Sequence, residues 1–506
     1  MTIEIGRLIL SSKNSYKIDG KRGKKSNILS TNIDPIVIFT NKEFSNIDNY
    51  CIINTLTKQI INNLGNIGNK QDDLNIYHYL FTYKWLSNSK FNNLLKNYNY
   101  DYDIVDNNLK SKRELYTNIV TTIDPIGSKD LDDGFTLIIN NEIEQIYNLD
   151  IHIADPTSFF DFNNPNMITI FNEFINRIAT CYIPLDDNKI KNLLPDFGSN
   201  NNFIEKSTLI GQNKRAITFC FKINIIKNSV DFEIKYTNLE SIENTDYDNW
   251  DNLINHPDKI KYKNHLVTLC NFMIMKMQCS IDYLSIEMNI SHKMIEIFMI
   301  WVNYWGGNYI YNNKNKMFTR TQNKYNNDIL NLFKIDYIKQ FLNYGAIYEY
   351  VDKKSEINYT HSSLGINNYC HLSSPMRRVI DMLNHLIIHD LPIDKFAKII
   401  QMINITDINN KLKIQKRLSN AYELINHLSI TNKFIAFVFD KLLNNKALLI
   451  LYDKYNNFKK IIKVELPSGI NIQKYDQLNI ELYYNAYKFN STWFPFTIKI
   501  IELLKN

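Results

Sequence analysis

The stretch TTIDPIGSKDLDDGFTL, residues 121–137, places four aspartates within ten residues, and Lys129 is the single base among them. The aspartates are Asp124, Asp130, Asp132 and Asp133. Carboxylates that lie this close in a folded chain repel one another unless a positive charge sits among them. The stretch therefore predicts either a cation site or a solvated acidic turn.

Two strand-like segments, FTLIIN and IYNLDIHIAD, follow the acidic stretch and flank residues 141–145. Their alternation favours an antiparallel hairpin, in which residues whose numbers sum to roughly 285 would pair. This register sets Asp132 opposite Ile153 and brings Asp155 within reach. We therefore expect the acids to gather at one end of a sheet.

The acidic stretch favours one class of metal. Neighbouring carboxylates in a dry site stay ionised when a divalent cation balances them. Oxygen ligands alone favour Mg²⁺ or Mn²⁺ over zinc or copper, and Mg²⁺ held by few carboxylates completes its shell with water and phosphate. An EF-hand loop counted from Asp130 would have Phe135 where glycine belongs. The pattern predicts phosphoryl chemistry, with a solvated turn as the open alternative.

A second segment, YCHLSSPMRRVIDMLNHLIIHDL, predicts a helix with Ser374 as N-cap and Pro375 at its first position. Arg377 and Arg378 would then lie in the first turn, next to the partial positive charge of the helix N-terminus. Two arginines at this place indicate a phosphate site. The alternative is an intrahelical pair between Arg377 and Asp381.

Four motifs occur in one order along the chain: TIDPIGSKDLDDGFTL, HIADPTSFF, HSSLGINNYCHLSSPMRR and DMLNH. Together they resemble the ribonuclease II and ribonuclease R family, whose catalytic RNB domain carries such motifs in this order. The resemblance covers residues 114–430. It implies a hydrolytic, processive 3′-to-5′ exoribonuclease that releases nucleoside 5′-monophosphates from single-stranded RNA.

The resemblance also implies roles in catalysis. Asp124, Asp130 and Asp133 look like the family's Mg²⁺ ligands. Asp132 occupies the place of the aspartate whose loss abolishes cleavage, and we expect it at the metal as well. Arg377 lies where the family's arginine contacts the scissile phosphate and stabilises its developing charge.

Three further residues are expected to bind RNA. Arg378 stands beside Arg377 in the same motif. Tyr182, in ATCYIP, falls near the family's tyrosine that stacks on the terminal base. Glu423, in NAYELI, is similar to an acid that helps to hold the 3′ nucleotide.

The chain of 506 residues is too long for one core and is expected to fold as α+β. The RNB catalytic domain, a mixed sheet with surrounding helices, would be flanked by small OB-type β-barrels, because five strand-like runs at the C-terminus match the count of such a barrel. The expected regions are 1–95, an OB or cold-shock-like barrel; 96–113, a linker; 114–430, the RNB domain; and 431–506, an OB or S1-like barrel.

Composition narrows the setting only moderately. The net charge of +6 and the 13% of aromatic residues are compatible with a single-stranded nucleic acid as partner. Six cysteines without a CxxC pair suggest neither zinc nor disulfides. No apolar run reaches the ~20 residues that span a bilayer. We expect a cytoplasmic monomer that acts on RNA and not on DNA, with no membrane partner.

Three positions depart from the family's pattern: Gly134 stands where Ala is usual, Val379 where Tyr or Trp is common, and Leu386 where Arg often follows NH. These departures predict a weaker grip on RNA, lower processivity or altered end specificity. The alternative function is a catalytically weak RNA-binding subunit or scaffold with the RNB fold. The four retained aspartates argue against that alternative.

Overall fold

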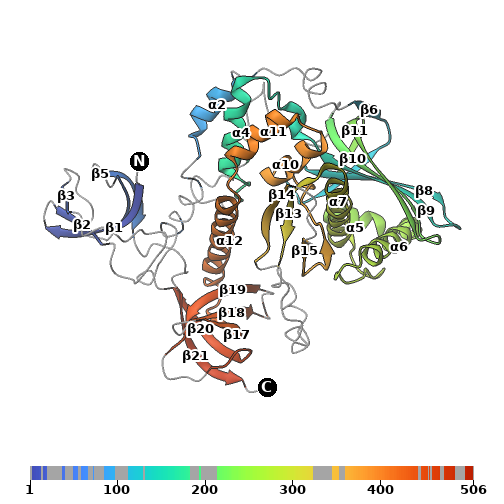
Figure 1. The fold of residues 1–506 in the computed structure, drawn as a ribbon. Helices are drawn as coiled ribbons and strands as arrows, with labels where there is room; N and C mark the ends of the chain where they lie inside the picture. Colours follow the sequence, from blue (N-terminus) through green and yellow to red (C-terminus); the bar gives the residue numbers. More distant parts are fainter. Residues whose placement is uncertain are drawn as a thin grey trace. The chain divides into compact units, whose positions relative to one another are not determined.

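The structure, a computed structural model, forms two compact units (Figure 1): Met1–Tyr83, Ile183–Ile190 and Lys411–Asn506 make up the first, and Lys84–Tyr182 and Lys191–Asn410 the second. The described residues are 3–12, 15–19, 37–39, 49–54, 59–66, 72, 74, 82, 85–96, 98, 112–128, 131–182, 193–194, 214–322, 345–352, 359–442, 446–453, 455, 458–467, 472–484 and 496–504.

The N-terminal region contains an antiparallel sheet with the strand order β3-β2-β1-β4-β5. The strands are β1 (Ile3–Ser12), β2 (Ser15–Asp19), β3 (Val37–Phe39), β4 (Asn49–Asn54) and β5 (Gln59–Asn66). These five strands are consistent with the small barrel expected within residues 1–95.

The C-terminal region contains a second antiparallel sheet, with the order β19-β18-β17-β20-β21. The strands are β17 (Lys433–Leu442), β18 (Lys446–Asp453), β19 (Phe458–Glu465), β20 (Gln477–Tyr484) and β21 (Phe496–Leu504). The edge strands β19 and β21 contact each other, which is consistent with the predicted small barrel. Leu424, near the end of helix α12 (Ile405–His427), joins the sheet's apolar core.

The second unit is built on a mixed sheet of seven strands, ordered β12-β7-β8-β9-β10-β11-β6. Its strands are β6 (Arg113–Tyr116), β7 (Val120–Asp124), β8 (Asp133–Asn141), β9 (Ile146–Ala154), β10 (Lys214–Asn224), β11 (Ser229–Leu239) and β12 (Ile242–Asp246). The edge strands β12 and β6 pair in parallel with β7 and β11, and the other neighbours are antiparallel.

Helices cover one face of this sheet (Figure 1). Polar and charged side chains such as Asp150, Lys222 and Glu233 lie on the other face. Phe135 of β8 packs against Trp250 and Phe298, and Phe221 of β10 packs against Trp301. The remaining elements are α2 (Asn88–Lys96), η1 (Pro156–Phe159), α4 (Pro165–Arg177), α5 (Tyr247–Ile254), η3 (Pro257–Lys259), α6 (Ile260–Met277), α7 (Ser291–Lys314), β13 (Lys316–Thr321), β14 (Ile347–Asp352), β15 (Thr360–His361), β16 (Ile366–Asn367), α10 (Val379–Ile388) and α11 (Ile393–Met402).

The predicted hairpin is confirmed as β8 and β9, but its predicted register is wrong by one residue. Asp133, and not Asp132, lies opposite Ile153. The pairing shifts between Ile139 and Asn141, just before the turn, because an extra residue is accommodated there. The acids still gather at one end of the sheet, but with Asp133 inside the ladder and Asp132 just before it.

The predicted start of the arginine helix is also wrong. Helix α10 begins at Val379, and Arg378 is its N-cap residue with extended backbone. Residues 375–377 form a turn, in which the amides of Arg377 and Arg378 both donate to the carbonyl of Ser374. A backbone pairing with Ile178 and Thr180 draws this segment out of helical geometry. The arginines therefore precede the helix and do not form its first turn.

Two findings bear on the predicted setting. The five cysteines whose side chains the structure describes are all free. None of the helices in the described part of the chain is long and apolar enough to cross a membrane.

Candidate active site

Asp124 lies at the end of β7, and strand β12 holds it there. In the parallel pairing of β7 with β12, Asp124 is aligned with Asp246, and the hydroxyl of Thr122 donates to Oδ1 of Asn244 at 2.9 Å. Strand β8 pairs with β7 only through Thr121 and Phe135. Strand β12 is therefore the main support for the position of Asp124.

Asp132 is the most buried of the acids, with 1% of its surface exposed. Its Oδ1 accepts a hydrogen bond from the amide of Met376 at 2.8 Å, and its Oδ2 accepts one from Nε of Arg377 at 2.6 Å. Its own carbonyl accepts from the amide of Ala154. A solvated acidic turn is therefore wrong for Asp132, which joins two segments 245 residues apart.

The three described acids of the stretch, Asp124, Asp132 and Asp133, form one electrostatic cluster. Burial raises the pKa of Asp124 to about 7, with a further contribution from the charge of Asp132. Burial raises the pKa of Asp133 to about 8, and the charges of Asp124 and Asp132 add to the effect. Burial also raises the pKa of Asp132, against the opposing charge of Arg377. The cluster holds more negative charge than Arg377 alone balances.

Asp124 and Asp133 differ from Asp132 in their contacts. Within the described residues, neither carboxylate has a hydrogen-bond or ion-pair partner. Their oxygens are therefore available to a ligand, whereas protein donors occupy both oxygens of Asp132.

Arg377 is held from two sides. Its Nε donates to Asp132, and its Nη2 donates to Oγ of Ser374 at 2.9 Å. The charge of Asp132 raises the pKa of Arg377, so the guanidinium stays protonated. The side chain is 42% exposed, which leaves one edge of it open to a ligand.

The open alternative, a pair between Arg377 and Asp381, is wrong, because Asp381 binds Arg378. Nε and Nη2 of Arg378 donate to the two oxygens of Asp381 at 2.9 and 2.8 Å, and the amide of Ser374 donates to Oδ2 at 2.8 Å. Asp381 thus stabilises the turn and occupies much of the Arg378 fork. Arg377 remains the arginine with the more accessible guanidinium.

The other predicted residues fall in different places. Tyr182 is half exposed, and its phenol lies near enough to Arg377 to affect the pKa of that arginine. Glu423 lies on α12 in the first unit, where Nζ of Lys460 binds it at 2.6 Å and the hydroxyl of Ser419 donates to it. Asp130 lies outside the described residues. The predicted roles of all three stay predictions.

Tyr247 is a site residue that the sequence did not reveal. Burial raises the pKa of its phenol, and the charges of Asp133 and Asp124 add to this rise, which places the phenol beside the acids. Its ring stacks on His292 at 3.7 Å. Tyr247 follows directly after β12, and no local pattern could have shown that β12 pairs with β7.

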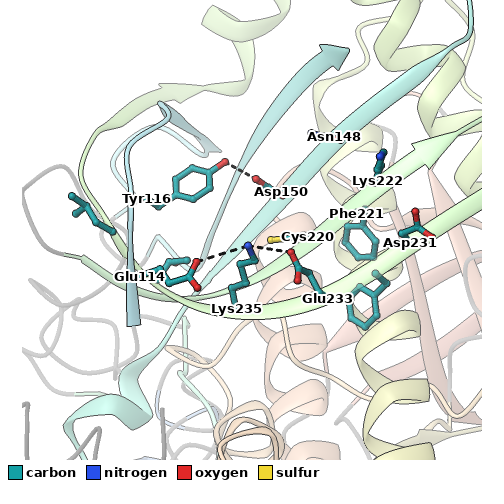
Figure 2. Close-up of a pocket in the computed structure, with 13 residues that line it drawn as sticks. Glu114, Tyr116, Asn148, Asp150, Cys220, Phe221, Lys222, Asp231, Glu233 and Lys235 are labelled. Atoms are coloured by element: carbon teal, nitrogen blue, oxygen red, sulfur yellow. Dashed lines mark hydrogen bonds and ion pairs between the residues drawn. The ribbon is translucent and has the colours of Figure 1, made fainter. Parts of the chain in front are cut away.

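Two of the pockets on the surface of this unit bear on the placement of the site. A cavity of about 290 Å³ opens beside Asp124 and is lined by Asp246 and Asn249 among others. Figure 2 shows a larger one, of about 510 Å³, on the polar face of the sheet, where Tyr116 donates to Asp150 and Lys235 lies between two glutamates. None of the predicted site residues lines the larger pocket.

The acidic cluster suits a divalent cation by its donor chemistry. Within the described residues, the carboxylate oxygens of Asp124 and Asp133 have no protein partners, and burial followed by the charges of the neighbouring aspartates raises the pKa values of both groups. The described part of the chain holds no group of three or more His, Cys, Asp or Glu side chains that could coordinate one ion. Asp130, the remaining acid of the stretch, lies outside that part.

A comparison with protein-family models decides the family. The model of the RNB domain matches residues 112–394, which is more than half of the chain. The chain belongs to the RNB domain family. RNB nucleases are hydrolytic exoribonucleases that generally depend on a divalent metal, and some members are pseudonucleases. Among curated proteins, no sequence matches the chain.

Solved structures with the same fold include both active and inactive proteins. RNase R of Mycoplasma genitalium, in complex with double-stranded RNA, aligns with a TM-score of 0.64 and 16% identity, over 99% of this chain and 96% of its own. Yeast Ssd1, described as a pseudonuclease, aligns with a TM-score of 0.63 and 13% identity, over 96% of this chain and 68% of its own.

An active-site mutant of the Dss1 exoribonuclease from Candida glabrata aligns with a TM-score of 0.55 and 18% identity. The alignment covers 74% of this chain and 54% of the Dss1 chain. The chain therefore spans about half the length of Dss1. At these identities the likenesses establish the α+β RNB fold. The predicted limits of the barrels, linker and catalytic domain stay predictions.

Proposed function

We propose that this chain is a hydrolytic 3′-to-5′ exoribonuclease that degrades single-stranded RNA processively to nucleoside 5′-monophosphates. One observation carries the proposal: Arg377 is bound to Asp132 beside two carboxylates that have no described protein partner. Carboxylates that repel one another in a buried site favour a bound cation over a purely structural role. The metal is proposed to be Mg²⁺, with Mn²⁺ as substitute.

Each described residue takes a task that follows from its contacts. Asp124 and Asp133, together with Asp130, are proposed to hold the cation. Asp132 orients the guanidinium of Arg377 and contributes its charge to the same centre. Bound Mg²⁺ supplies activation of a water molecule and neutralisation of charge on the phosphate. The open edge of Arg377 then donates to the scissile phosphate, where negative charge develops.

The remaining predicted residues are proposed to hold the RNA. Tyr182, half exposed near Arg377, offers a ring for the terminal base. Arg378 is expected to contribute less than Arg377, because Asp381 occupies its fork. Glu423 is proposed to contact the 3′ nucleotide. A monomeric state is proposed as well.

The test is a degradation assay with 5′-labelled oligo(U) RNA, the matched DNA, and RNA whose 3′ end lies in a duplex. Shortening of the RNA from its 3′ end in Mg²⁺, stopped by EDTA and by Asp132→Asn, supports the proposal. Asp231→Asn is the matched control, since it makes the same change at an exposed position of the polar face. Equal attack on DNA, or shortening by Asp132→Asn, would contradict it.

The alternative is a pseudonuclease that binds RNA without cleaving it, and the similarity to Ssd1 favours it. The same assay separates the two functions. Retention of RNA on a filter without any shortening, in Mg²⁺ or Mn²⁺, would support the pseudonuclease.

A further inference from the structure

Arg320 is a partly buried cation to which no carboxylate of the described residues is paired. It lies on β13 opposite Tyr348 of β14, and its guanidinium carbon lies 4.5 Å from the centre of the Tyr348 ring. Burial lowers the pKa of Arg320, which reflects the cost of keeping this charge away from water. Within the described residues no acid forms an ion pair with Arg320, and such uncompensated charges are characteristic of binding sites.

The backbone places Arg320 beside the segment that leads to the arginine turn. Its amide donates to the carbonyl of Tyr369 at 2.7 Å, and Thr319 forms a bridge with Cys370. The phenol of Tyr348 is hydrogen-bonded to Nδ1 of His371 at 2.6 Å. The same segment continues through Ser374 to Arg377.

This segment lies close against helix α7. Asn303 of α7 accepts from the amide of Leu372 and donates to the phenol of Tyr369. At Gly307, an added Cβ would lie only 2.2 Å from the carbonyl oxygen of Asn368, so the approach requires glycine. Arg320 is thus mounted on the same rigid support as the candidate active site.

The local charges leave a positive surplus at Arg320. Arg377 is paired with Asp132 and Arg378 with Asp381, so each of these two arginines has its own carboxylate. The neighbouring His371 does not balance this charge, because a histidine side chain is neutral or positive. Burial, and then the charges of Arg378 and Arg320, hold the pKa of His371 well below its usual range.

A guanidinium held over an aromatic ring loses part of its freedom to move, and its planar fork matches a phosphate. We propose that Arg320, held against Tyr348, binds a backbone phosphate of the RNA strand other than the scissile one. The inference rests on the proposed function, since it places this phosphate on the substrate of that site. Arg320 is a positioning residue: it fixes the strand, while Arg377 acts on the reacting phosphate.

The experiment measures RNA binding in EDTA, where no cleavage is needed, by fluorescence anisotropy of oligo(U). One linkage at a time is replaced by a neutral methylphosphonate. We expect Arg320→Ala to weaken binding about tenfold, the loss typical of a charged hydrogen bond. At one position along the RNA, the methylphosphonate should weaken RNA binding by the wild type to the same extent. The same replacement should leave the RNA affinity of Arg320→Ala unchanged.

Lys222→Ala is the matched control, because it removes one exposed positive charge from the polar face of the sheet (Figure 2). Its affinity and its linkage profile should stay within twofold of the wild type. Arg320→Gln, which keeps a polar side chain, repeats the test if Arg320→Ala does not fold. A linkage profile in which no position depends on Arg320 overturns the proposal.

Turnover separates this inference from the proposed function. In Mg²⁺, Arg320→Ala should raise KM about tenfold and change kcat less than twofold, since it removes uniform binding. A fall in kcat at unchanged KM would overturn the positioning role. A wild type that shows the linkage profile but does not shorten RNA would contradict the nuclease and leave the phosphate contact standing. A wild type that does not bind RNA would overturn both.

Discussion

The Asp155 carboxylate and the acidic cluster lie at the same end of strands β8 and β9, yet they differ in every contact. Oδ2 of Asp155 accepts from Arg113 at 2.5 Å and from His389 at 2.9 Å, and its Oδ1 accepts from Thr157. Although burial acts in the opposite direction, the charges of His389 and Arg113 hold the pKa of Asp155 well below its usual range.

Asp133, by contrast, has a pKa raised to about 8 and no described protein partner. Both carboxylates are out of bulk water, so burial alone does not separate them. The donors provided by the fold separate them: Asp155 is satisfied and joins α10 to the sheet, whereas Asp133 receives no donor from the described residues. Four substitutions test this contrast.

Asp133→Asn should have the largest effect, and on activity. We expect RNA degradation to fall by about 10³-fold or more, because a ligand of the proposed cation is lost. In EDTA, the free energy of unfolding should rise by about 1 kcal/mol, since one of the mutually repelling charges is gone. Mg²⁺ should raise the Tm of the wild type and not that of the variant. If Mg²⁺ raised the Tm of the wild type and of Asp133→Asn equally, Asp133 would not be a ligand of the cation and the contrast with Asp155 would fail.

Asp155→Asn should act on stability instead. Leaving Arg113 without a carboxylate is expected to lower the free energy of unfolding by about 3–5 kcal/mol, measured by denaturant titration. The pKa of Asp155 is lowered in the folded state, so its ionisation stabilises the fold above about pH 4 and this contribution is lost as the pH falls. The gap between wild type and variant should therefore narrow below about pH 4. Asp231→Asn, an exposed control, should show no gap at any pH.

Gly134→Ala tests how tightly β7 and β8 meet at the cluster. An added Cβ would lie 2.7 Å from Cγ1 of Val120 and 3.1 Å from the carbonyl oxygen of Thr121. We expect the substitution to lower the free energy of unfolding by about 1–3 kcal/mol. Val120→Ala in the same chain should recover most of this loss, whereas additive losses in the double variant would rule out the close contact.

Lys235→Met should have the smallest effect, because the ion pairs of the polar face are exposed (Figure 2). Nζ of Lys235 lies 3.1 Å from Glu233 and 3.8 Å from Glu114, and both glutamates are more than half exposed. The change in the free energy of unfolding should stay below about 1 kcal/mol and shrink further in high salt. If Lys235→Met lowered the free energy of unfolding as much as Asp155→Asn, burial would not determine how much these ion pairs stabilise the fold.

Much of the fold was predictable because its signals are local. Alternating residues and turn residues predicted the β8–β9 hairpin and the strands of the C-terminal sheet, and the motif order predicted the RNB family. The register of the hairpin and the start of α10 were predicted wrongly. The register depends on an extra residue that β8 accommodates just before the turn, which the alternation of residues does not show. The start of α10 depends on a distant segment, because Arg378 pairs with Ala179.

The physical reasons for the departures from the family's pattern were also visible only in the structure. Val379 and Leu386 are fully buried within α10, so they contribute to the core of the second unit. Gly134 has no room for a methyl group, because the side chain of Val120 occupies the space. What the sequence shows as a loss of a usual residue is, at Gly134, a fit to a neighbouring strand.

The sequence by itself determined which groups are present: a run of aspartates, a pair of arginines, and the order of motifs that marks an RNB domain. Only the tertiary structure decided which aspartate binds Arg377 and which arginine is occupied by Asp381. It also decided that Tyr247 lies near Asp133 and that Arg320 lies near Arg378. The physical reason is that charge and hydrogen-bonding capacity belong to single residues. Whether they are satisfied depends on donors and acceptors brought from far along the chain.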